Sequence, residues 1–105
     1  MDSLELSLNP AAQHYEAKLE GRVVAFIEYR DDSSVRSLTH TKVNPDLEGQ
    51  GIGSQLVKFA LEEIRSSGSS LVPVCPFVAT YVQRHREYAE LVAPAHWARV
   101  VTLET

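Results

Sequence analysis

The most informative segment of the sequence is Glu48-Gly49-Gln50-Gly51-Ile52-Gly53, which separates an alternating apolar run from a helical pattern. Its closely spaced glycines allow a sharp turn and a close approach of the backbone to a bulky group. The helical pattern begins at Ile52, and the first turn of a helix carries N–H groups with no partner inside the helix. Together with the helix dipole, such groups cradle an anion, usually a phosphate. We therefore predict that this segment holds a pyrophosphate.

The size and composition of the chain fit one small domain, which we place at residues 1–105. Apolar residues make up 44 % of the sequence, enough for a single core. The formal net charge of −4 argues against nucleic acid or an anionic membrane as the main partner. We expect neither a membrane span nor a signal peptide, because the required apolar runs are missing. The single cysteine fits a reducing compartment, so we expect a cytoplasmic protein.

The segment before the glycine-rich loop is typical of β-strands joined by short turns. Leucines alternate with polar residues near the N-terminus, and β-branched and aromatic residues are frequent after Gly21. A polar turn is expected at residues 31–34, and Pro45 should end the last strand. Because the connections are short, the strands should form an antiparallel meander. The expected strands are residues 4–8, 14–19, 22–30 and 35–43.

The segment after the loop is typical of two helices flanking one strand. From Ile52 the apolar residues recur on one helical face, and Gly68 is a candidate left-handed cap. The apolar run at residues 71–75 predicts a buried strand beside the fourth, followed by a helix from Pro76 to about Arg86. We also expect a helical turn at residues 87–92 and an edge strand at residues 100–103. The predicted fold class is α+β, with four antiparallel strands, a parallel fourth and fifth pair, and two main helices.

The sequence from Val43-Asn44-Pro45 through the glycine-rich loop to Leu56 is similar to the acetyl-CoA loop of the GNAT acyltransferase superfamily. The family pattern is Gln/Arg-x-x-Gly-x-Gly/Ala between a strand and a helix. Glu48 stands where most such loops carry Gln or Arg, and a carboxylate facing a diphosphate is unfavourable unless it points to solvent. Residues 38–92 also resemble the minimal single-domain GNAT-like proteins of the YjdJ type. The residues that carry this resemblance are His40-Thr41, Val74-Cys75-Pro76-Phe77-Val78, Tyr81, His85, Glu87-Tyr88 and Leu91-Val92.

The resemblance implies an N-acetyltransferase that uses acetyl-CoA and an amine acceptor, either a small molecule or a protein. The cofactor would lie where the fourth and fifth strands splay apart, with its pantetheine added to the fourth strand by backbone hydrogen bonds. The chain lacks room for the helices that hold the acceptor in larger members, so the acceptor site should be small, open or shared with a partner. The cofactor-binding residues implied in this way are Thr41, Val43, Gly49, Gln50, Gly51, Ile52, Gly53, Ser54, Phe77 and Tyr81.

Cys75 and His40 are the candidate catalytic residues. Cys75 should lie directly before a helix, where a thiol can be partly thiolate near neutral pH. It could accept the acetyl group as a nucleophile or protonate the departing CoA thiolate, or it could be a small buried apolar residue. One residue of strand register decides whether His40 faces the split. Facing it, His40 could deprotonate the amine or orient Cys75; otherwise it is a structural histidine.

Other readings of the sequence stay open at this point. The histidines and the cysteine show no metal-ligand spacing, so no metal site is predicted. Arg84 and Arg86 could meet the 3′-phosphate of CoA, but we favour a solvated helix surface for both. The chain could instead be a non-catalytic acyl-CoA-binding module or a protein-interaction domain with a degenerate loop. We expect a monomer or a weak homodimer, with Trp97 or the last strand as the dimer edge.

Overall fold

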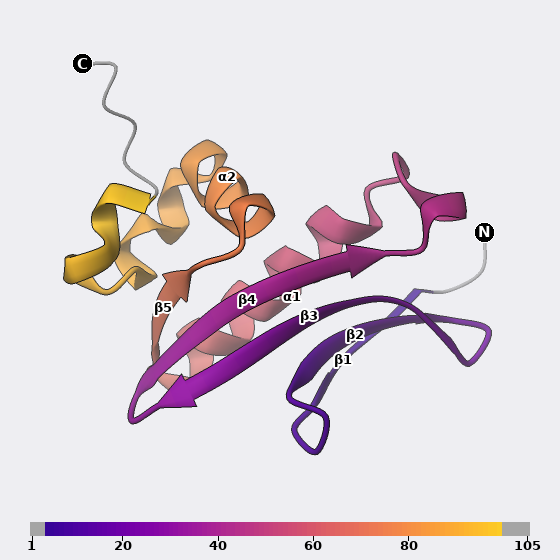
Figure 1. The fold of residues 1–105 in the computed structure, drawn as a ribbon, viewed down its shortest axis with the longest axis horizontal. Helices are drawn as coiled ribbons and strands as arrows, with labels where there is room; N and C mark the ends of the chain where they lie inside the picture. The colour runs from indigo at the N-terminus through magenta and orange to yellow at the C-terminus, as the bar shows by residue number, and fades with distance from the viewer. Residues whose placement is uncertain (1–3, 100–105) are drawn as a thin grey trace.

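The computed structural model describes residues 4–99, which form a five-stranded sheet with helices packed on it (Figure 1). The strands lie in the order β1-β2-β3-β4-β5. The pairs among β1 to β4 are antiparallel, and β4 and β5 are parallel, so the predicted α+β class is confirmed. The strands are β1 (Leu4–Asn9), β2 (His14–Leu19), β3 (Arg22–Asp32), β4 (Val35–Val43) and β5 (Ser70–Pro73).

The hairpin between β3 and β4 is tighter than the sequence predicted. Asp31 pairs with Arg36 and Asp32 pairs with Val35, so both aspartates belong to β3 rather than to the turn. The turn is left to Ser33-Ser34, where Ser33 takes a positive φ of 57°. The polar composition of the segment suggested a longer turn, but strand pairing on both sides shortens it to the residues that reverse the chain.

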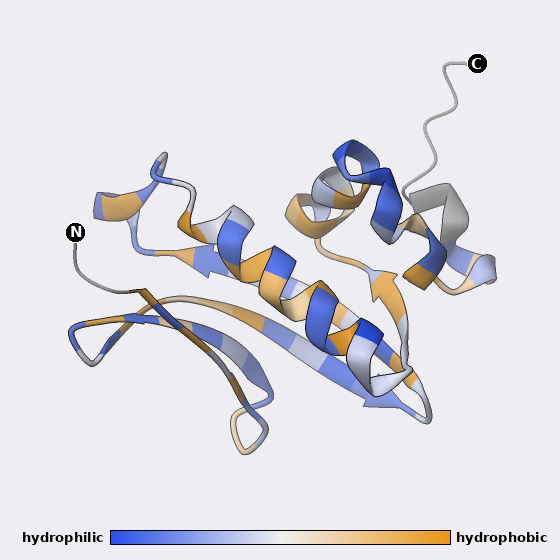
Figure 2. Cartoon of the chain, turned by 180° about the vertical axis from the view of Figure 1, so that it is seen from behind, coloured by the Kyte–Doolittle hydropathy of each residue, from blue (hydrophilic) through white to orange (hydrophobic). Residues whose placement is uncertain are grey.

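Helix α1 (Ile52–Ser67) crosses from β4 back to β5 and packs against β2, β3 and β4. Its apolar residues recur along one side, and Figure 2 shows hydrophobic and hydrophilic segments alternating along the helix. Gly68 ends the helix as predicted, at a φ of 77°, with its N–H bonded to the carbonyls of Arg65 and Ile64. The buried side of α1 is formed by Ile52, Gly53, Leu56, Val57, Ala60, Leu61 and Ile64.

The chain after β5 is less regular than the sequence predicted. β5 ends at Pro73, two residues before the expected end, and helix α2 (Pro76–Arg84) also stops two residues early. The N–H of His85 bonds to the carbonyls of both Tyr81 and Val82, which tightens the chain into the 3₁₀ helix η2 (Arg86–Leu91). The expected strand at residues 100–103 lies outside the described residues, as does the side chain of Trp97.

The last described segment returns to the edge of β5. Val92 forms a parallel bridge with Leu71, and the N–H of Ala93 donates to the Leu71 carbonyl at 2.9 Å. The 3₁₀ helix η3 (Pro94–Arg99) follows, and a third one, η1 (Pro45–Leu47), lies between β4 and the glycine-rich loop. Within residues 4–99, no helix has both the length and the apolar character needed to cross a membrane.

Arg36 forms a polar network between the sheet and α1 that the sequence did not reveal. Its guanidinium donates to both carboxylate oxygens of Asp31, at 2.6 and 2.8 Å, and to the Tyr15 hydroxyl at 2.8 Å. Tyr15 in turn donates to Glu63 on α1 at 2.6 Å. The hydrogen bonds from Arg36 lower the pKa of Asp31, while burial raises the pKa of Tyr15. The network therefore ties three strands to the helix.

Candidate functional site

A cavity of about 450 Å³ lies where the end of β4, the glycine-rich loop and the starts of both helices meet. This volume falls within the range of about 300–1,000 Å³ that small-molecule sites occupy. The glycine-rich loop therefore forms one wall of a cavity large enough for a small molecule. The residues that line it are Thr41, Val43, Leu47, Glu48, Gly49, Gly51, Ile52, Gly53, Ser54 and Phe77.

The cavity begins where β4 and β5 separate. Their pairing ends at Leu38 and Pro73, and the last backbone hydrogen bond runs from the Cys75 N–H to the Leu38 carbonyl at 2.9 Å. Between Pro73 and Cys75 the chain bends, because the N–H of Val74 donates to the carbonyl of Val72. From there α2 leads away from the sheet, as Figure 1 shows. The β5-facing edge of β4 beyond Leu38 therefore opens on the cavity.

A β-bulge in β4 determines which backbone groups face this opening. Thr39 is the extra residue between the pairs Glu28–His40 and Tyr29–Leu38. Beyond the bulge, the Asn44 N–H donates to Val24 on β3 at 2.8 Å, so the backbone of Asn44 faces β3. Because backbone groups alternate in direction along a strand, those of Val43 and Thr41 face the cavity. They can pair with an extended ligand, which the family resemblance implied for these two residues and which stays a prediction.

The glycine-rich loop leads into the start of α1, whose first N–H groups have no partner within the helix. Gly49 and Gly51 both have positive φ values, 86° and 82°, which side chains rarely allow. Gly51 caps α1 without a side-chain hydrogen bond, and the first helical bond runs from Gln55 N–H to the Gly51 carbonyl. The N–H groups of the preceding residues, Ile52 to Ser54, therefore point out of the helix end. This arrangement can bind an anion.

Gly53 meets a different requirement, because it needs to be small. It is buried in α1, and a Cβ built on it would lie 3.0 Å from Cζ of Phe77 and 3.4 Å from Cγ2 of Val43. The missing side chain lets the Phe77 ring from α2 and the Val43 side chain from β4 close over the helix. Phe77 is still 44 % exposed, so its ring provides an apolar wall that a ligand can cover.

Cys75 lies beside the cavity, at the N-cap position of α2. Its side chain is buried, with 6 % of its surface exposed, and its thiol donates to the Thr41 hydroxyl at 3.4 Å. Because Thr41 lines the cavity, this contact brings the thiol to the cavity wall. The site can therefore combine a thiol, an anion cradle and an open strand edge.

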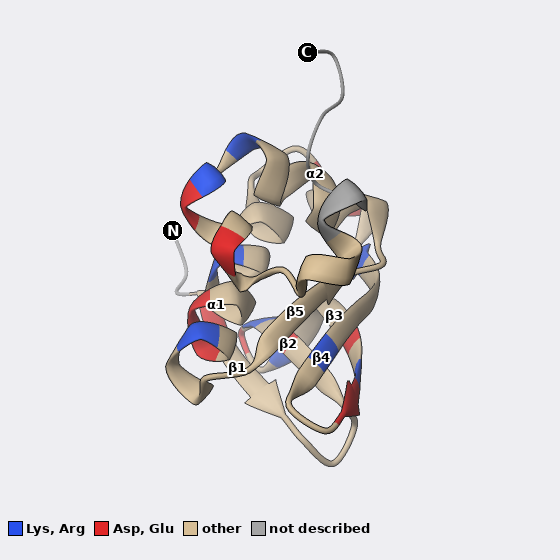
Figure 3. Ribbon diagram, turned by 90° about the vertical axis from the view of Figure 1, so that its left-hand side faces the viewer, with Lys and Arg blue, Asp and Glu red and all other residues tan. Residues whose placement is uncertain are grey.

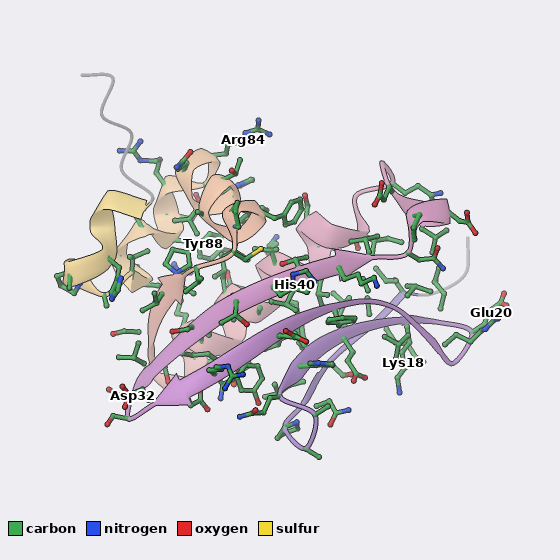
Figure 4. All side chains as sticks on the ribbon, viewed as in Figure 1. Lys18, Glu20, Asp32, His40, Arg84 and Tyr88 are labelled. Atoms are coloured by element: carbon green, nitrogen blue, oxygen red, sulfur yellow. The ribbon has the colours of Figure 1, made fainter. Side chains whose placement is uncertain are left out.

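The structure does not bring His40 to Cys75. His40 is exposed on the side of β4 opposite Thr41, where its ring centroid lies 6.3 Å from that of Phe26 (Figure 4). The bulge at Thr39 is the physical reason. The extra residue keeps both Leu38 and Thr41 on the helix side of the sheet, and it turns His40 outward. Phe26 in turn stacks on His14, with ring centroids 4.6 Å apart.

Two residues expected to bind the cofactor do not line the cavity, and two unexpected residues do. Gln50 is exposed, and Tyr81 stacks on His85 with ring centroids 3.9 Å apart. Leu47 and Glu48 are part of the wall instead. Leu47 is brought there by η1, which begins where the Asn44 side chain accepts a hydrogen bond from the Asp46 N–H. The Asx-type cap formed by Asn44 before Pro45 is the sequence feature from which the position of Leu47 could have been predicted.

Comparisons with known proteins identify the family and the fold. The family model described as GCN5-related N-acetyl-transferase matches residues 14–91. A GCN5-like candidate N-acetyltransferase from Staphylococcus aureus, solved by NMR, has a TM-score of 0.68 and 25 % sequence identity. The alignment covers 89 % of this chain and 91 % of that one. No curated protein matches the sequence significantly.

Two longer proteins share the fold. A GNAT family acetyltransferase from Brucella melitensis, crystallised with acetyl-CoA, has a TM-score of 0.55 at 22 % identity, over 72 % of this chain and 54 % of its own. The ribosomal-protein-S18-alanine N-acetyltransferase from Escherichia coli has a TM-score of 0.53 at 24 % identity, over 55 % of this chain and 38 % of its own. The chain thus spans about half of the first protein and little more than a third of the second.

Proposed function

The chain belongs to the GCN5-related N-acetyltransferase family, and from this we propose that it transfers an acetyl group from acetyl-CoA to an amine. The observation that carries the proposal is the cavity at the split of β4 and β5. It gathers every residue expected to bind the cofactor except Gln50 and Tyr81. The crystal structure of the Brucella protein with acetyl-CoA supports the choice of ligand.

The cavity offers a separate contact to each part of acetyl-CoA. The pantetheine would extend β4 by pairing with the backbone of Thr41 and Val43, as an added strand does. The apolar walls formed by Val43 and Phe77 would cover its methyl groups. The diphosphate would lie on the N–H groups of Gly49 to Ser54, where the loop and the helix dipole favour an anion.

The reaction transfers the acetyl group without a net change in oxidation state. The amine nitrogen attacks the thioester carbonyl carbon, the C–S bond breaks, and the nitrogen loses a proton while the CoA sulfur gains one. Holding donor and acceptor together removes much of the entropic barrier, and a backbone N–H of β4 would stabilise the oxyanion. Cys75 would either protonate the CoA thiolate or carry the acetyl group as a thioester between the two substrates. We assign no step to His40, because it lies on the other side of the sheet.

Two measurements test this proposal. Calorimetry with CoA should show binding, and incubation with acetyl-CoA and a panel of primary amines should release the CoA thiol. Binding without thiol release would favour the non-catalytic acyl-CoA-binding module, which the exposed Glu48 and the buried Cys75 also fit. If CoA neither binds nor raises the melting temperature, the cavity is not a CoA site and a protein-interaction domain is the better reading.

A further inference from the structure

We propose that this cavity recognises its acyl donor mainly by the pantetheine arm, and that Glu48 weakens recognition of the nucleotide end. The inference rests on the proposed function, since it concerns how acetyl-CoA would be held in the same cavity. It assigns a specificity-determining role to Glu48, and it names the class of donor as pantetheine thioesters in general.

The part of the cavity next to β4 suits pantetheine. Pantetheine is an extended chain with amide groups and geminal methyl groups, so it needs backbone partners and an apolar wall. The backbone groups of Thr41 and Val43 face the opening, as the bulge and the Asn44–Val24 hydrogen bond require. Apolar side chains come from three further elements, namely Leu47 of η1, Ile52 of α1 and Phe77 of α2. None of these contacts depends on charge.

The part of the cavity next to the loop offers a diphosphate backbone N–H groups but, within residues 4–99, no basic side chain. Among the described residues that line the cavity, Glu48 is the charged one, and no lysine or arginine is among them. Lys42 is exposed on the opposite side of β4 from Val43, and Lys58 is exposed one helical turn beyond Ser54 without lining the cavity. In Figure 3 the basic and acidic segments are interspersed along the ribbon rather than gathered at one end.

The diphosphate therefore meets opposing electrostatic effects. The helix dipole and the N–H groups at the start of α1 attract it. The Glu48 carboxylate, which lines the same cavity, repels it. Since the repulsion reduces the attraction, the nucleotide end should add little to the affinity that the pantetheine arm provides.

Calorimetric titration of the full chain with CoA, 4′-phosphopantetheine and pantetheine tests the inference. In the wild type, CoA should bind no more than about tenfold tighter than pantetheine, a difference of about 1.4 kcal/mol. Glu48→Gln should tighten CoA about three- to tenfold and leave pantetheine unchanged, because the variant removes one repulsive charge. Asp46→Asn is the matched control, since Asp46 is an exposed carboxylate on η1 that does not line the cavity.

The outcomes separate this inference from the proposed function. CoA binding more than about tenfold tighter than pantetheine in the wild type would overturn the specificity assignment and leave the proposed function intact. An equal response of both ligands to Glu48→Gln, or an equal response of CoA to Asp46→Asn, would also overturn it. If none of the ligands binds, the proposed function itself fails. Salt adds a readout on the wild type that needs no variant: screening should weaken CoA binding little, and a steep loss would contradict the balance of charges.

Discussion

The ring of Phe77 on α2 packs onto the Cα of Gly53 on α1. A Cβ built on Gly53 would lie 3.0 Å from Cζ and 3.2 Å from Cε2 of that ring, which is closer than most Cβ contacts in proteins. The atoms in the way belong to the far end of a side chain, so the ring rather than the backbone would move. Because Phe77 lines the cavity, its displacement changes the space for a ligand.

Gly53→Ala should therefore weaken CoA binding while leaving the fold stable. Overpacking typically costs about 1–3 kcal/mol, whereas alanine is better than glycine in a helix by about 1 kcal/mol. We expect a CoA affinity about three- to tenfold lower, measured by calorimetry, and a melting temperature close to that of the wild type. The control is Phe77→Leu in the same background, whose shorter side chain should restore part of the affinity. Wild-type affinity in Gly53→Ala alone would show that the ring has room to move elsewhere.

Cys75→Ala should abolish most acetyl transfer without affecting cofactor binding. General acid or nucleophilic groups typically contribute about 10²–10⁴-fold, so we expect at least about a hundredfold loss in turnover. The dissociation constant of CoA should stay within about twofold, because the thiol lies behind Thr41 rather than in the cavity lining. Thr41→Val, which removes the hydroxyl that accepts from the thiol, tests separately whether this hydrogen bond affects turnover. Undiminished turnover in Cys75→Ala would leave the cysteine a purely structural role.

His40→Ala should change turnover by less than about twofold, and the pH dependence of turnover should keep its shape. The reason is its position: the side chain is exposed next to Phe26, on the side of the sheet away from Cys75. Steady-state rates across the pH range would check this. A loss of turnover of more than about tenfold, or the disappearance of a transition from the pH profile, would show that His40 takes part in catalysis.

Tyr88 should make the fold sensitive to alkaline pH. Burial and its 2.6 Å hydrogen bond to Glu62 raise the pKa of Tyr88 from 10.0 to about 12. The contribution of Tyr88 to stability is therefore complete below its pKa in the unfolded chain, and it is lost as the pH rises through its pKa in the folded protein. The urea midpoint of the wild type should fall more steeply between these values than that of Tyr88→Phe. Tyr15, whose pKa burial also raises, should leave a residual slope in the variant. Parallel curves for the two proteins would refute the assignment to Tyr88.

The fold was predictable where local patterns determine it. Alternation gave β2 and β4 their observed bounds, helical periodicity gave the start of α1, and Gly68 gave its cap. The glycine-rich loop could be predicted to line a cavity, because glycine spacing and a helix start are visible in a single sequence. The cytoplasmic location and the single domain over residues 1–105 stay predictions of the same kind.

The rest depends on contacts between distant residues. The bulge at Thr39 is a property of the β3–β4 pair, and no residue in β4 marks it by type, so the direction of His40 was open. Arg36 looks like a solvated strand residue in sequence, yet its partners Tyr15 and Glu63 lie 21 and 27 positions away. The roles of Cys75 and of the loop N–H groups stay predictions, because they depend on the ligand that enters the cavity.

The bend at the end of β5 has a consequence for how fast the site can be filled. A continued ladder would need backbone donors that face β4, but the Val74 N–H bonds to the Val72 carbonyl instead, and Cys75 forms the last backbone hydrogen bond to β4. The gap in the sheet is thus part of the folded chain. A partner that extends β4 displaces no neighbouring strand, so its association rate should follow diffusion and orientation rather than an unzipping step.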